Sequence, residues 1–390
     1  MAHRVNPYCA GAGTRPPLLA GRGRQLAQVD YLAGQFEGHR GAESIVWYGL
    51  RGMGKTVLLR EVTDRLRDRG WLVGYHEVRR DAGIGGSIAG VLVQASRALG
   101  RGRLATALGW LREQLGGASL TADLGEVTLR LGLQSTRSAP LPEDALDALF
   151  VRLGEAAADA SVGAAFLLDE LQLMDRHDLS ALLHAADAAK DLPLAFIGAG
   201  LPDLPGHLAA AGTYAERLFY DRVDWLSDTD VVEALTVPAG EFGVTYSAGA
   251  LDVLVGHIRA YPYFLQLYAE ETWKAAGTPS DRPGQVMETR DVEAALGAVD
   301  RRLDEGLYRI RLEKASPSEQ DYLRAMASLG DGRVSSGEVV RVLGKSHQQA
   351  STQRDRLITK GLVYSPAHNA LEFTVPGFGA YLRRHFDLGT

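Results

Sequence analysis

The chain has very little cysteine and no long apolar run. Among its 390 residues Cys9 is the one cysteine, so neither an intrachain disulfide nor a cysteine-based zinc site can form. No stretch reaches the roughly 18 consecutive apolar residues that a membrane-spanning helix needs. The opening residues also lack the apolar centre of a secretory signal. These absences predict a protein of the reducing cytoplasm with no membrane partner.

Basic residues are not in excess either. Lys and Arg number 42 against 48 Asp and Glu, which gives a formal net charge of −6. The whole chain is therefore not a basic nucleic-acid coat, and any contact with nucleic acid must come from a local patch. The length allows two or three domains, and 46% hydrophobic with 23% charged residues is an ordinary globular balance.

Short apolar runs alternate with helical patterns in the first half of the chain. An insert at about 79–163 interrupts this alternation, and inside it Val127–Gln134 alternates apolar and polar residues like one arm of a hairpin. We interpret the insert as an edge decoration, with a partner-docking surface as the alternative. The alternation predicts an α/β fold with a parallel sheet covered on both faces. The expected strands are Ser44–Tyr48, Trp71–Val78, Ala164–Leu168, Leu194–Ile197 and Tyr220–Trp225.

From Ser227 onward helical patterns replace the strands, and Thr289–Leu312 is expected to be one long helix. Capping boxes at Ser316 and Ser335 open two further helices, and His347–Lys360 gives a third. Two extended runs flank a turn at 366–369 after it. Three helices followed by a β-hairpin form the outline of a winged helix.

A glycine-rich loop follows the first expected strand. Gly49–Thr56 fits the pattern G-x-x-x-x-G-K-[ST] between a strand and a helix, where backbone N–H groups and the helix N-terminus can surround a phosphate. Lys55 can reach the β- and γ-phosphates, and Thr56 can offer its hydroxyl to Mg²⁺. The alternative is a glycine-rich turn that ends in Lys-Thr by coincidence. The loop residues expected at the nucleotide are Gly49, Gly52, Met53, Gly54, Lys55, Thr56 and Val57.

Two adjacent acids end the third expected strand. Burying unpaired carboxylates is costly, so Asp169 and Glu170 after an apolar run need a reason. Asp169 lies at the carboxyl end of the strand, where α/β sheets bind ligands, and can hold Mg²⁺ through water. Glu170 can act as general base on the attacking water. The alternative is a surface helix cap that follows the strand.

Together the two motifs resemble the additional-strand, catalytic-glutamate class of P-loop ATPases. Within it the chain is similar to AAA+ and STAND-like prokaryotic ATPases, close to archaeal-type ATPases and origin-recognition-type initiators. Leu19–Leu26 resembles the V-G-R-x-x-E-L box that covers the adenine, here with Gly21 and Arg22. Ala260–Gln266 resembles the lid motif G-G-x-P-x-x-L-Q, with Pro262 as its proline.

The resemblance covers about residues 18–385. It implies a P-loop ASCE-type parallel sheet with a helical lid and a C-terminal winged-helix domain, using ATP and Mg²⁺. It also implies that Arg217 acts as an arginine finger toward a neighbouring copy, so that a nucleotide-dependent homo-oligomer forms. A local ion pair with Glu216 or Asp221 is the alternative for Arg217. The implied domains are an arm at 1–18, the core at 19–226, the lid with its connecting helix at 227–312 and the winged helix at 313–390.

Some positions depart from the family pattern. The fourth expected strand ends in Gly198-Ala199-Gly200, without the polar sensor side chain that relatives often carry there. Arg24 stands near a usual Glu, and Ala260 replaces a usual Gly. Arg259 is the nearest candidate for a second sensor, with a solvated helix-end arginine as the alternative.

The third helix of the predicted winged helix is rich in cationic and amide side chains. Such side chains can reach phosphates and base edges, and His368 and Asn369 could touch a neighbouring groove. The alternative is a solvated helix in a domain that contacts protein. The residues expected to bind DNA are Lys345, Gln348, Arg354, Arg356 and Lys360.

These patterns predict an ATP-binding and ATP-hydrolysing conformational switch that associates with DNA through its winged helix. A STAND-like signalling ATPase, whose winged helix binds a protein partner, is the alternative. A small-molecule kinase is a third and weaker hypothesis, because a kinase has no evident use for a winged helix.

Overall fold

The computed structural model describes residues 5–11, 13–38, 40–79, 143–277, 284–367 and 369–388, with the residue pairs 120–121 and 130–131. The chain divides into two compact units. The core unit comprises Arg22–Gly49 and Gly54–Asp224. The C-terminal unit comprises Met1–Gly21, Leu50–Met53 and Trp225–Thr390. Among the described residues, no helix combines the length and the apolarity needed to cross a bilayer.

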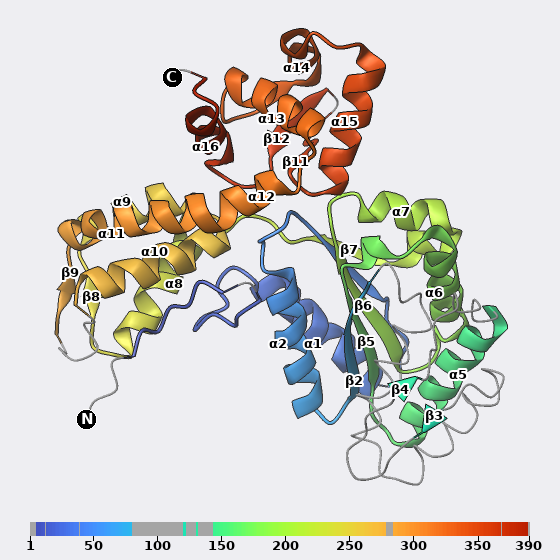
Figure 1. Cartoon of the computed structure of the whole chain (residues 1–390). Coiled ribbons are helices and arrows are strands. Elements are labelled where there is room, and N and C mark those ends of the chain that lie inside the picture. Colours follow the sequence, from blue (N-terminus) through green and yellow to red (C-terminus); the bar gives the residue numbers. More distant parts are fainter. Residues whose placement is uncertain are drawn as a thin grey trace. The chain divides into compact units, whose positions relative to one another are not determined.

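A five-stranded parallel sheet forms the centre of the core unit (Figure 1). Every residue of its central strands β5 and β6 is buried, which explains their continuous apolar sequences. The predicted parallel sheet is confirmed, although its fourth strand extends to Gly200 and its fifth ends at Arg222. The strand order is β2 (Leu72–Glu77), β5 (Ala164–Asp169), β6 (Leu194–Gly200), β1 (Ile45–Tyr48) and β7 (Phe219–Arg222).

Helices cover both faces of this sheet. In Figure 1, α1 (Gly23–Glu37) and α2 (Lys55–Asp68) lie on one side. On the other side lie α5 (Glu143–Asp159), α6 (Arg176–Ala188) and α7 (Leu204–Ala211). The packing includes Phe150 of α5 stacked on Phe166 of β5, with ring centroids 4.8 Å apart. Because the sheet is parallel, the carboxyl ends of β1, β5 and β6 meet at one edge.

Most of the predicted insert at 79–163 lies outside the described residues. The described part contains an antiparallel pair of short strands, β3 (Leu120–Thr121) and β4 (Arg130–Leu131). β4 falls within the alternating segment Val127–Gln134, in agreement with one arm of a hairpin. The role of the insert in docking a partner stays a prediction.

Helices predominate from Ser227 onward, as predicted, although two short strands that were not predicted also occur there. Ser227 caps the first of these helices, because its Oγ accepts from the N–H of Asp230 at 3.1 Å while the Asp230 carboxylate accepts from the N–H of Ser227 at 2.9 Å. The two strands, β8 (Thr245–Tyr246) and β9 (Val286–Met287), form a short parallel pair. The helices are α8 (Asp228–Gly240), α9 (Ala248–Ile258), α10 (Pro262–Ala275) and α11 (Thr289–Arg302).

The single long helix predicted at Thr289–Leu312 is wrong in one respect. Regular α-helix ends at Arg302, and a π-helical segment, Leu303–Tyr308, precedes α12 (Arg309–Glu313). The wider turn coincides with a contact of Tyr308, whose hydroxyl donates to the carbonyl of Pro376 at 2.8 Å. Such a π segment redirects side chains without ending the helix, and the periodicity of the sequence does not reveal it.

Tyr8 belongs to the arm predicted at 1–18, yet it is buried. Its side chain is 2% exposed, and its ring meets Trp273 edge-on with centroids 5.8 Å apart. Its hydroxyl donates to the carbonyl of Leu235 and accepts from Tyr246 at 3.2 Å. The glycine- and proline-rich composition of the arm concealed this one buried aromatic residue.

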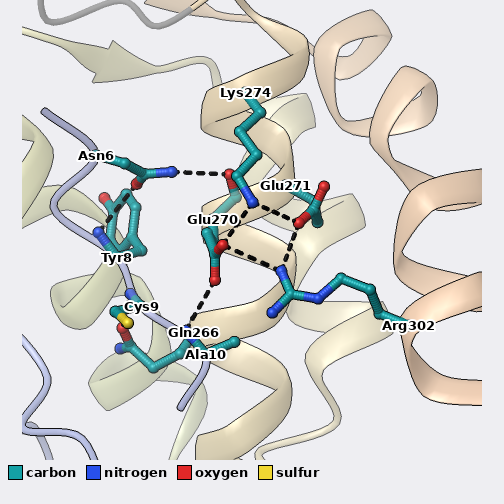
Figure 2. A network of polar contacts seen from close by, with 9 residues as sticks. All are labelled: Asn6, Tyr8, Cys9, Ala10, Gln266, Glu270, Glu271, Lys274 and Arg302. Atoms are coloured by element: carbon teal, nitrogen blue, oxygen red, sulfur yellow. Dashed lines mark hydrogen bonds and ion pairs between the residues drawn. The ribbon is translucent and has the colours of Figure 1, made fainter. Parts of the chain in front are cut away.

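Polar contacts hold the arm along α10 (Figure 2). Asn6 donates to the carbonyl of Glu270 at 3.0 Å, and the N–H of Ala10 donates to the Glu270 carboxylate at 2.9 Å. Lys274 and Arg302 both pair with Glu270 and Glu271 in the same network. Although burial alone would raise the pKa of Glu270, the hydrogen bonds from Lys274, Ala10 and Arg302 hold it below its ordinary value.

The last part of the chain contains the predicted three helices and two following strands. A further strand and a final helix were not predicted. The missed helix shows its apolar face in Phe378, Tyr381 and Leu382, all of them buried. A small sheet has the order β10-β12-β11. The elements are α13 (Pro317–Leu329), β10 (Val334–Ser335), α14 (Ser336–Leu343), α15 (His347–Thr359), β11 (Val363–Tyr364), β12 (Ala370–Phe373) and α16 (Phe378–His385).

Candidate nucleotide site

The glycine-rich loop between β1 and α2 needs its glycines for different reasons. Gly52 and Gly54 have φ of +83° and +87°, a left-handed region that favours glycine, and Gly54 caps α2. Gly49 instead meets a close neighbour, because a Cβ there would lie 2.2 Å from the carbonyl oxygen of Val223. The loop therefore has a backbone shape that side chains at these positions would disturb.

Lys55 and Thr56 open α2, so both side chains lie at its N-terminus. The ammonium of Lys55 donates to the carbonyl of Gly49 at 2.7 Å, which folds the side chain back over the loop. The positive end of the helix and a mobile cation at one point favour an anion there. Val57 follows in the first turn.

The hydroxyl of Thr56 lies 2.6 Å from a carboxylate oxygen of Asp169, and donates to it. Asp169 is 2% exposed and also accepts from the backbone N–H of Glu170 at 2.9 Å. Burial raises its pKa, although the hydrogen bonds from Thr56 and Glu170 oppose that effect. The structure thus brings together the two predicted metal ligands, a hydroxyl and a carboxylate.

Tyr75 is a member of this site that the sequence analysis missed. Its hydroxyl donates to the Asp169 carboxylate at 3.2 Å from the neighbouring strand β2. Burial, and after it the charge of Asp169, raises the pKa of Tyr75, so that it stays a donor. The parallel register pairs His76 with Leu168 and Glu77 with Asp169, but this register could not be derived without the strand order.

Glu170 has a left-handed backbone, with φ 54° and ψ 36°, at the start of the 3₁₀ turn Leu171–Leu173. Non-glycine residues adopt this conformation at some energetic cost, and such residues gather at functional sites. Its carboxylate accepts a hydrogen bond from the side-chain amide of Gln172. Gln172 in turn accepts from the backbone N–H of Leu201 at 3.1 Å.

Comparison with known protein families decides the class of this site. Residues 18–197 match a family described as AAA ATPase domain. Residues 18–197 therefore form an AAA ATPase domain. Residues 305–382 match a second family, described as a domain of unknown function (DUF8462). No curated protein matches the chain at a significant level.

Solved structures with similar folds support the assignment. The Aeropyrum pernix ORC2 protein, solved as ADPNP-ADP complexes, has a TM-score of 0.56 at 14% identity, covering 97% of this chain and 98% of that one. The Walker-type ATPase paby2304 of Pyrococcus abyssi has a TM-score of 0.54 at 17% identity, covering 95% and 97%. At such identities the likeness concerns the fold. The predicted resemblance to origin-recognition-type ATPases is confirmed at that level.

The segment Leu19–Leu26, before the first strand of the sheet, contacts β7 and the residues just after it. Arg22 is 4% exposed and donates to the carbonyl of Asp224 at 3.0 Å. Arg24, which stands near the usual Glu, pairs with Asp221, and Gln25 donates to the same carboxylate at 2.8 Å. Arg22 is thus a buried structural residue, and its contact with adenine stays a prediction.

Several predicted nucleotide residues belong to the C-terminal unit. Gly21 has φ of +67°, and Pro262 is the first residue of α10. Beside Pro262, the hydroxyl of Tyr261 donates to the carbonyl of Arg51 at 3.1 Å. A Cβ on Gly52 would lie 2.0 Å from this hydroxyl oxygen. Arg259 caps α9 with a left-handed backbone. The roles of Gly21, Pro262 and Arg259 at the nucleotide stay predictions.

Arg217 ends the 3₁₀ turn Thr213–Arg217 just before β7, and its side chain is 63% exposed. It pairs with Asp187 of α6 at 2.8 Å, not with Glu216 or Asp221 as the alternative expected. Its guanidinium also lies over the ring of Tyr214, 5.8 Å from the centroid. The role of Arg217 as an arginine finger toward a neighbouring copy stays a prediction.

The predicted DNA-binding residues differ in their surroundings. Lys360 pairs with Glu319, which is 2% exposed, and donates to the carbonyl of Lys314 at 2.9 Å. Lys345 pairs with Asp321 at 3.4 Å and Arg354 with Asp355 at 3.0 Å, both at the surface. Arg356 and Gln348 are exposed on α15.

The turn between β11 and β12 was the second place expected to contact DNA. His368 lies outside the described residues. Asn369 has a left-handed backbone with φ of 59°, and its carbonyl accepts from the N–H of Ser336 at 2.9 Å.

Proposed function

We propose that this ATPase is a conformational switch that binds ATP-Mg at Gly49–Thr56 and hydrolyses it with Glu170 as general base. The observation that carries the proposal is the 2.6 Å hydrogen bond from Thr56 to Asp169, which places both motifs at one edge of the sheet. Lys55 would neutralise the β- and γ-phosphates beside it. Gly49, Gly52, Met53, Gly54 and Val57 would surround the phosphates with backbone N–H groups.

The residues present suit Mg²⁺. The Thr56 hydroxyl and one Asp169 oxygen are hard oxygen donors, and Mg²⁺ is commonly held by one or two such groups together with phosphates and water. Among the described residues, no cluster of three or more His, Cys, Asp or Glu side chains could hold a metal without a nucleotide. When bound, Mg²⁺ would offset charge on the phosphates, and Thr56 and Asp169 would hold it in place.

In the hydrolytic step, Glu170 accepts a proton from a water while that water attacks the γ-phosphorus. A new phosphorus–oxygen bond forms, the bond from the γ-phosphorus to the bridging oxygen breaks, and ADP and phosphate leave. We assign the base to Glu170 because it is half-buried, whereas Asp169 is 2% exposed and already accepts from Thr56, Tyr75 and the N–H of Glu170.

Contacts of the loop tip support a switch. Tyr261 of the lid donates to Arg51, and the Arg51 Nε would lie 2.6 Å from a Cβ on Gly361 in the C-terminal domain. One loop segment thus touches both the helical lid and the C-terminal domain. A change at the phosphates that moves this tip would therefore change its contacts with the lid and with the C-terminal domain.

We further propose that the C-terminal part, 313–390, is a winged helix whose α15 contacts duplex DNA. Support comes from the exposed Arg356 and Gln348 and from the surface pairs of Lys345 and Arg354, which phosphates can displace. The competing function is a STAND-like switch that binds a protein partner. It is favoured by the pairing of three of the four α15-region cations with acids of their own domain.

The proposal also includes a nucleotide-dependent homo-oligomer in which Arg217 acts in a neighbouring copy. A cytoplasmic location stays a prediction from the single cysteine.

The decisive experiment measures ATP hydrolysis by the whole chain with and without duplex DNA, and the particle mass with ATP and with ADP. DNA-stimulated turnover supports the DNA-associated switch. Turnover that ignores DNA, with no DNA binding at low salt, supports the protein-partner alternative. Absence of any ATP hydrolysis under all these conditions contradicts the proposal.

A further inference from the structure

The carboxyl end of β6 has no polar side chain of its own. β6 ends in Gly198, Ala199 and Gly200, yet this strand lies between β5 and β1, whose ends carry the acids and the phosphate loop. The polar group present there comes from another element. It is the carboxamide of Gln172, from the 3₁₀ turn after Glu170.

Glycine at position 200 makes room for this side chain. A Cβ on Gly200 would lie 2.6 Å from the Gln172 Oε1, so any larger residue there would displace the carboxamide. The strand that lacks a polar group therefore accommodates one supplied by its neighbour.

The hydrogen bonds fix the orientation of the amide. The backbone N–H of Leu201 donates at 3.1 Å, so it must face the oxygen of the carboxamide. The nitrogen of the same group then faces Glu170 and donates to its Oε2. Gln172 is thus a bridge from the end of β6 to one oxygen of the Glu170 carboxylate.

The main chain and the side chain of Glu170 are both held in place. The left-handed conformation of Glu170 and the hydrogen bond from the N–H of Leu173 to its carbonyl, at 2.8 Å, fix its main chain. Gln172 restrains the side chain that this main chain presents. With Oε2 bound to Gln172, Oε1 is the oxygen left to accept a proton from a water.

We propose that Gln172 is a positioning residue for ATP hydrolysis, which holds the Glu170 carboxylate in the orientation that a general base needs. The inference rests on the proposed role of Glu170. A small misplacement of a catalytic group can cost about 10²-fold in rate. Loss of the bridge should therefore lower kcat while the affinity for ATP, set by the loop, stays the same.

Two substitutions separate positioning from a structural role. Gln172→Glu has nearly the same shape and still accepts from Leu201, but it loses the donor and places a like charge beside Glu170. Gln172→Met keeps the length and loses both hydrogen bonds. We expect both to lower kcat by about 10- to 100-fold, with ATP-Mg affinity within about twofold of native by calorimetry. Arg176→Gln, at an exposed position of α6, is the control.

If Gln172 only anchors Leu201, Gln172→Glu keeps the native kcat and Gln172→Met alone is slow. That result overturns the inference. Thermal unfolding of each variant identifies any loss of folding, and Gln172→Glu is the decisive variant because it preserves the anchor.

Combination with Glu170→Gln tests whether Gln172 acts through Glu170. In that background Gln172→Glu should cause no further loss of the residual rate, because effects of residues that act as one unit are not additive. An equal further loss means that Gln172 acts independently, and overturns the inference. A native rate in Glu170→Gln itself contradicts the proposed function, and the inference then fails with it. An impaired Glu170→Gln beside a native Gln172→Glu overturns the inference alone.

Discussion

The hydroxyl of Thr56 at the start of α2 donates to the carboxylate of Asp169 at the end of β5 over 2.6 Å, although the two residues are 113 positions apart. This bond unites the two sequence motifs into one site. It also places two oxygen ligands that suit Mg²⁺ next to Lys55, the neighbour of Thr56 in the loop.

Removal of the Lys55 ammonium should weaken ATP-Mg binding. A hydrogen bond to a charged group contributes about 1.5–3 kcal/mol, so Lys55→Ala should raise the Kd by about 10- to 100-fold. Calorimetry with a non-hydrolysable ATP analogue measures the change. Lys190→Ala, at an exposed lysine of the same unit, is the matched control. An unchanged Kd in Lys55→Ala would show that the nucleotide binds elsewhere.

Asp169→Asn should stabilise the protein without ligand while it abolishes stabilisation by ATP-Mg. Burial raises the pKa of Asp169 above its ordinary 3.8. Between 3.8 and the raised pKa the native state binds more protons than the unfolded state, so the free energy of unfolding falls as pH rises through this window. Asparagine does not titrate, and with its oxygen toward Thr56 and Tyr75 it loses only the hydrogen bond from the N–H of Glu170.

Denaturant unfolding of the native protein and of Asp169→Asn between pH 4 and pH 8, without nucleotide or metal, checks this expectation. The difference between their free energies of unfolding, in favour of Asp169→Asn, should grow with pH. Asp68→Asn, on an exposed face of α2, controls for the loss of one negative charge. An Asp169→Asn protein that is less stable at every pH contradicts the assigned burial cost.

Tyr8→Ala should destabilise the C-terminal unit by about 3–5 kcal/mol, since it removes a buried aromatic ring. Tyr8→Phe keeps the ring against Trp273 and loses the hydroxyl that bonds with Leu235 and Tyr246, so a cost nearer 1 kcal/mol is expected. Denaturant unfolding followed by tryptophan fluorescence measures both. Tyr31→Ala, at an aromatic residue 68% exposed on α1, is the control. Equal stability of Tyr8→Ala and native protein would mean that the arm does not pack as described.

Motifs with fixed local spacing could be predicted from the sequence, and contacts that depend on the register between distant segments could not. Gly49–Thr56 and Asp169–Glu170 were found because each carries its chemistry within a few residues. Tyr75 and Gln172 were missed, since their roles arise only when β2 and β6 align beside β5. Tyr8 was missed for a related reason, because its partners lie more than 220 positions away.

Separate substitutions should distinguish the roles of Arg356 and Lys360. Arg356 is exposed, so Arg356→Ala should leave stability unchanged and, if α15 contacts DNA, lower the salt slope of binding by about one unit per lost phosphate contact. Lys360→Ala leaves the buried Glu319 without its cation and should destabilise the C-terminal domain. DNA titrations at several salt concentrations and thermal unfolding check both. No change of slope in Arg356→Ala, in protein that binds DNA, removes Arg356 from the interface.

Arg217 and Asp187 together offer a test of action between copies. If Arg217 serves only its ion pair with Asp187, the variants Arg217→Ala and Asp187→Ala remove the same interaction and should have the same effect on turnover. If Arg217 stabilises charge on the phosphates of a neighbouring copy, Arg217→Ala should slow turnover by about 10³-fold or more, the scale of an arginine finger. Asp187→Ala should then keep the native rate, because it releases the arginine and does not remove it.

Mixing two inactive variants decides whether Arg217 acts in a neighbouring copy. Glu170→Gln lacks the proposed base but keeps its arginine, whereas Arg217→Ala lacks the arginine but keeps its base. In a mixed assembly, some sites would combine the Glu170 of one copy with the Arg217 of the next, because each variant supplies what the other lacks. Turnover should therefore reappear on mixing, in proportion to the mixed interfaces that form. Native mass measurement of the mixture, with ATP present, establishes that the two variants assemble together. Co-assembly without recovered turnover shows that Arg217 does not complete a site in the neighbouring copy, and its pair with Asp187 would then be its whole role.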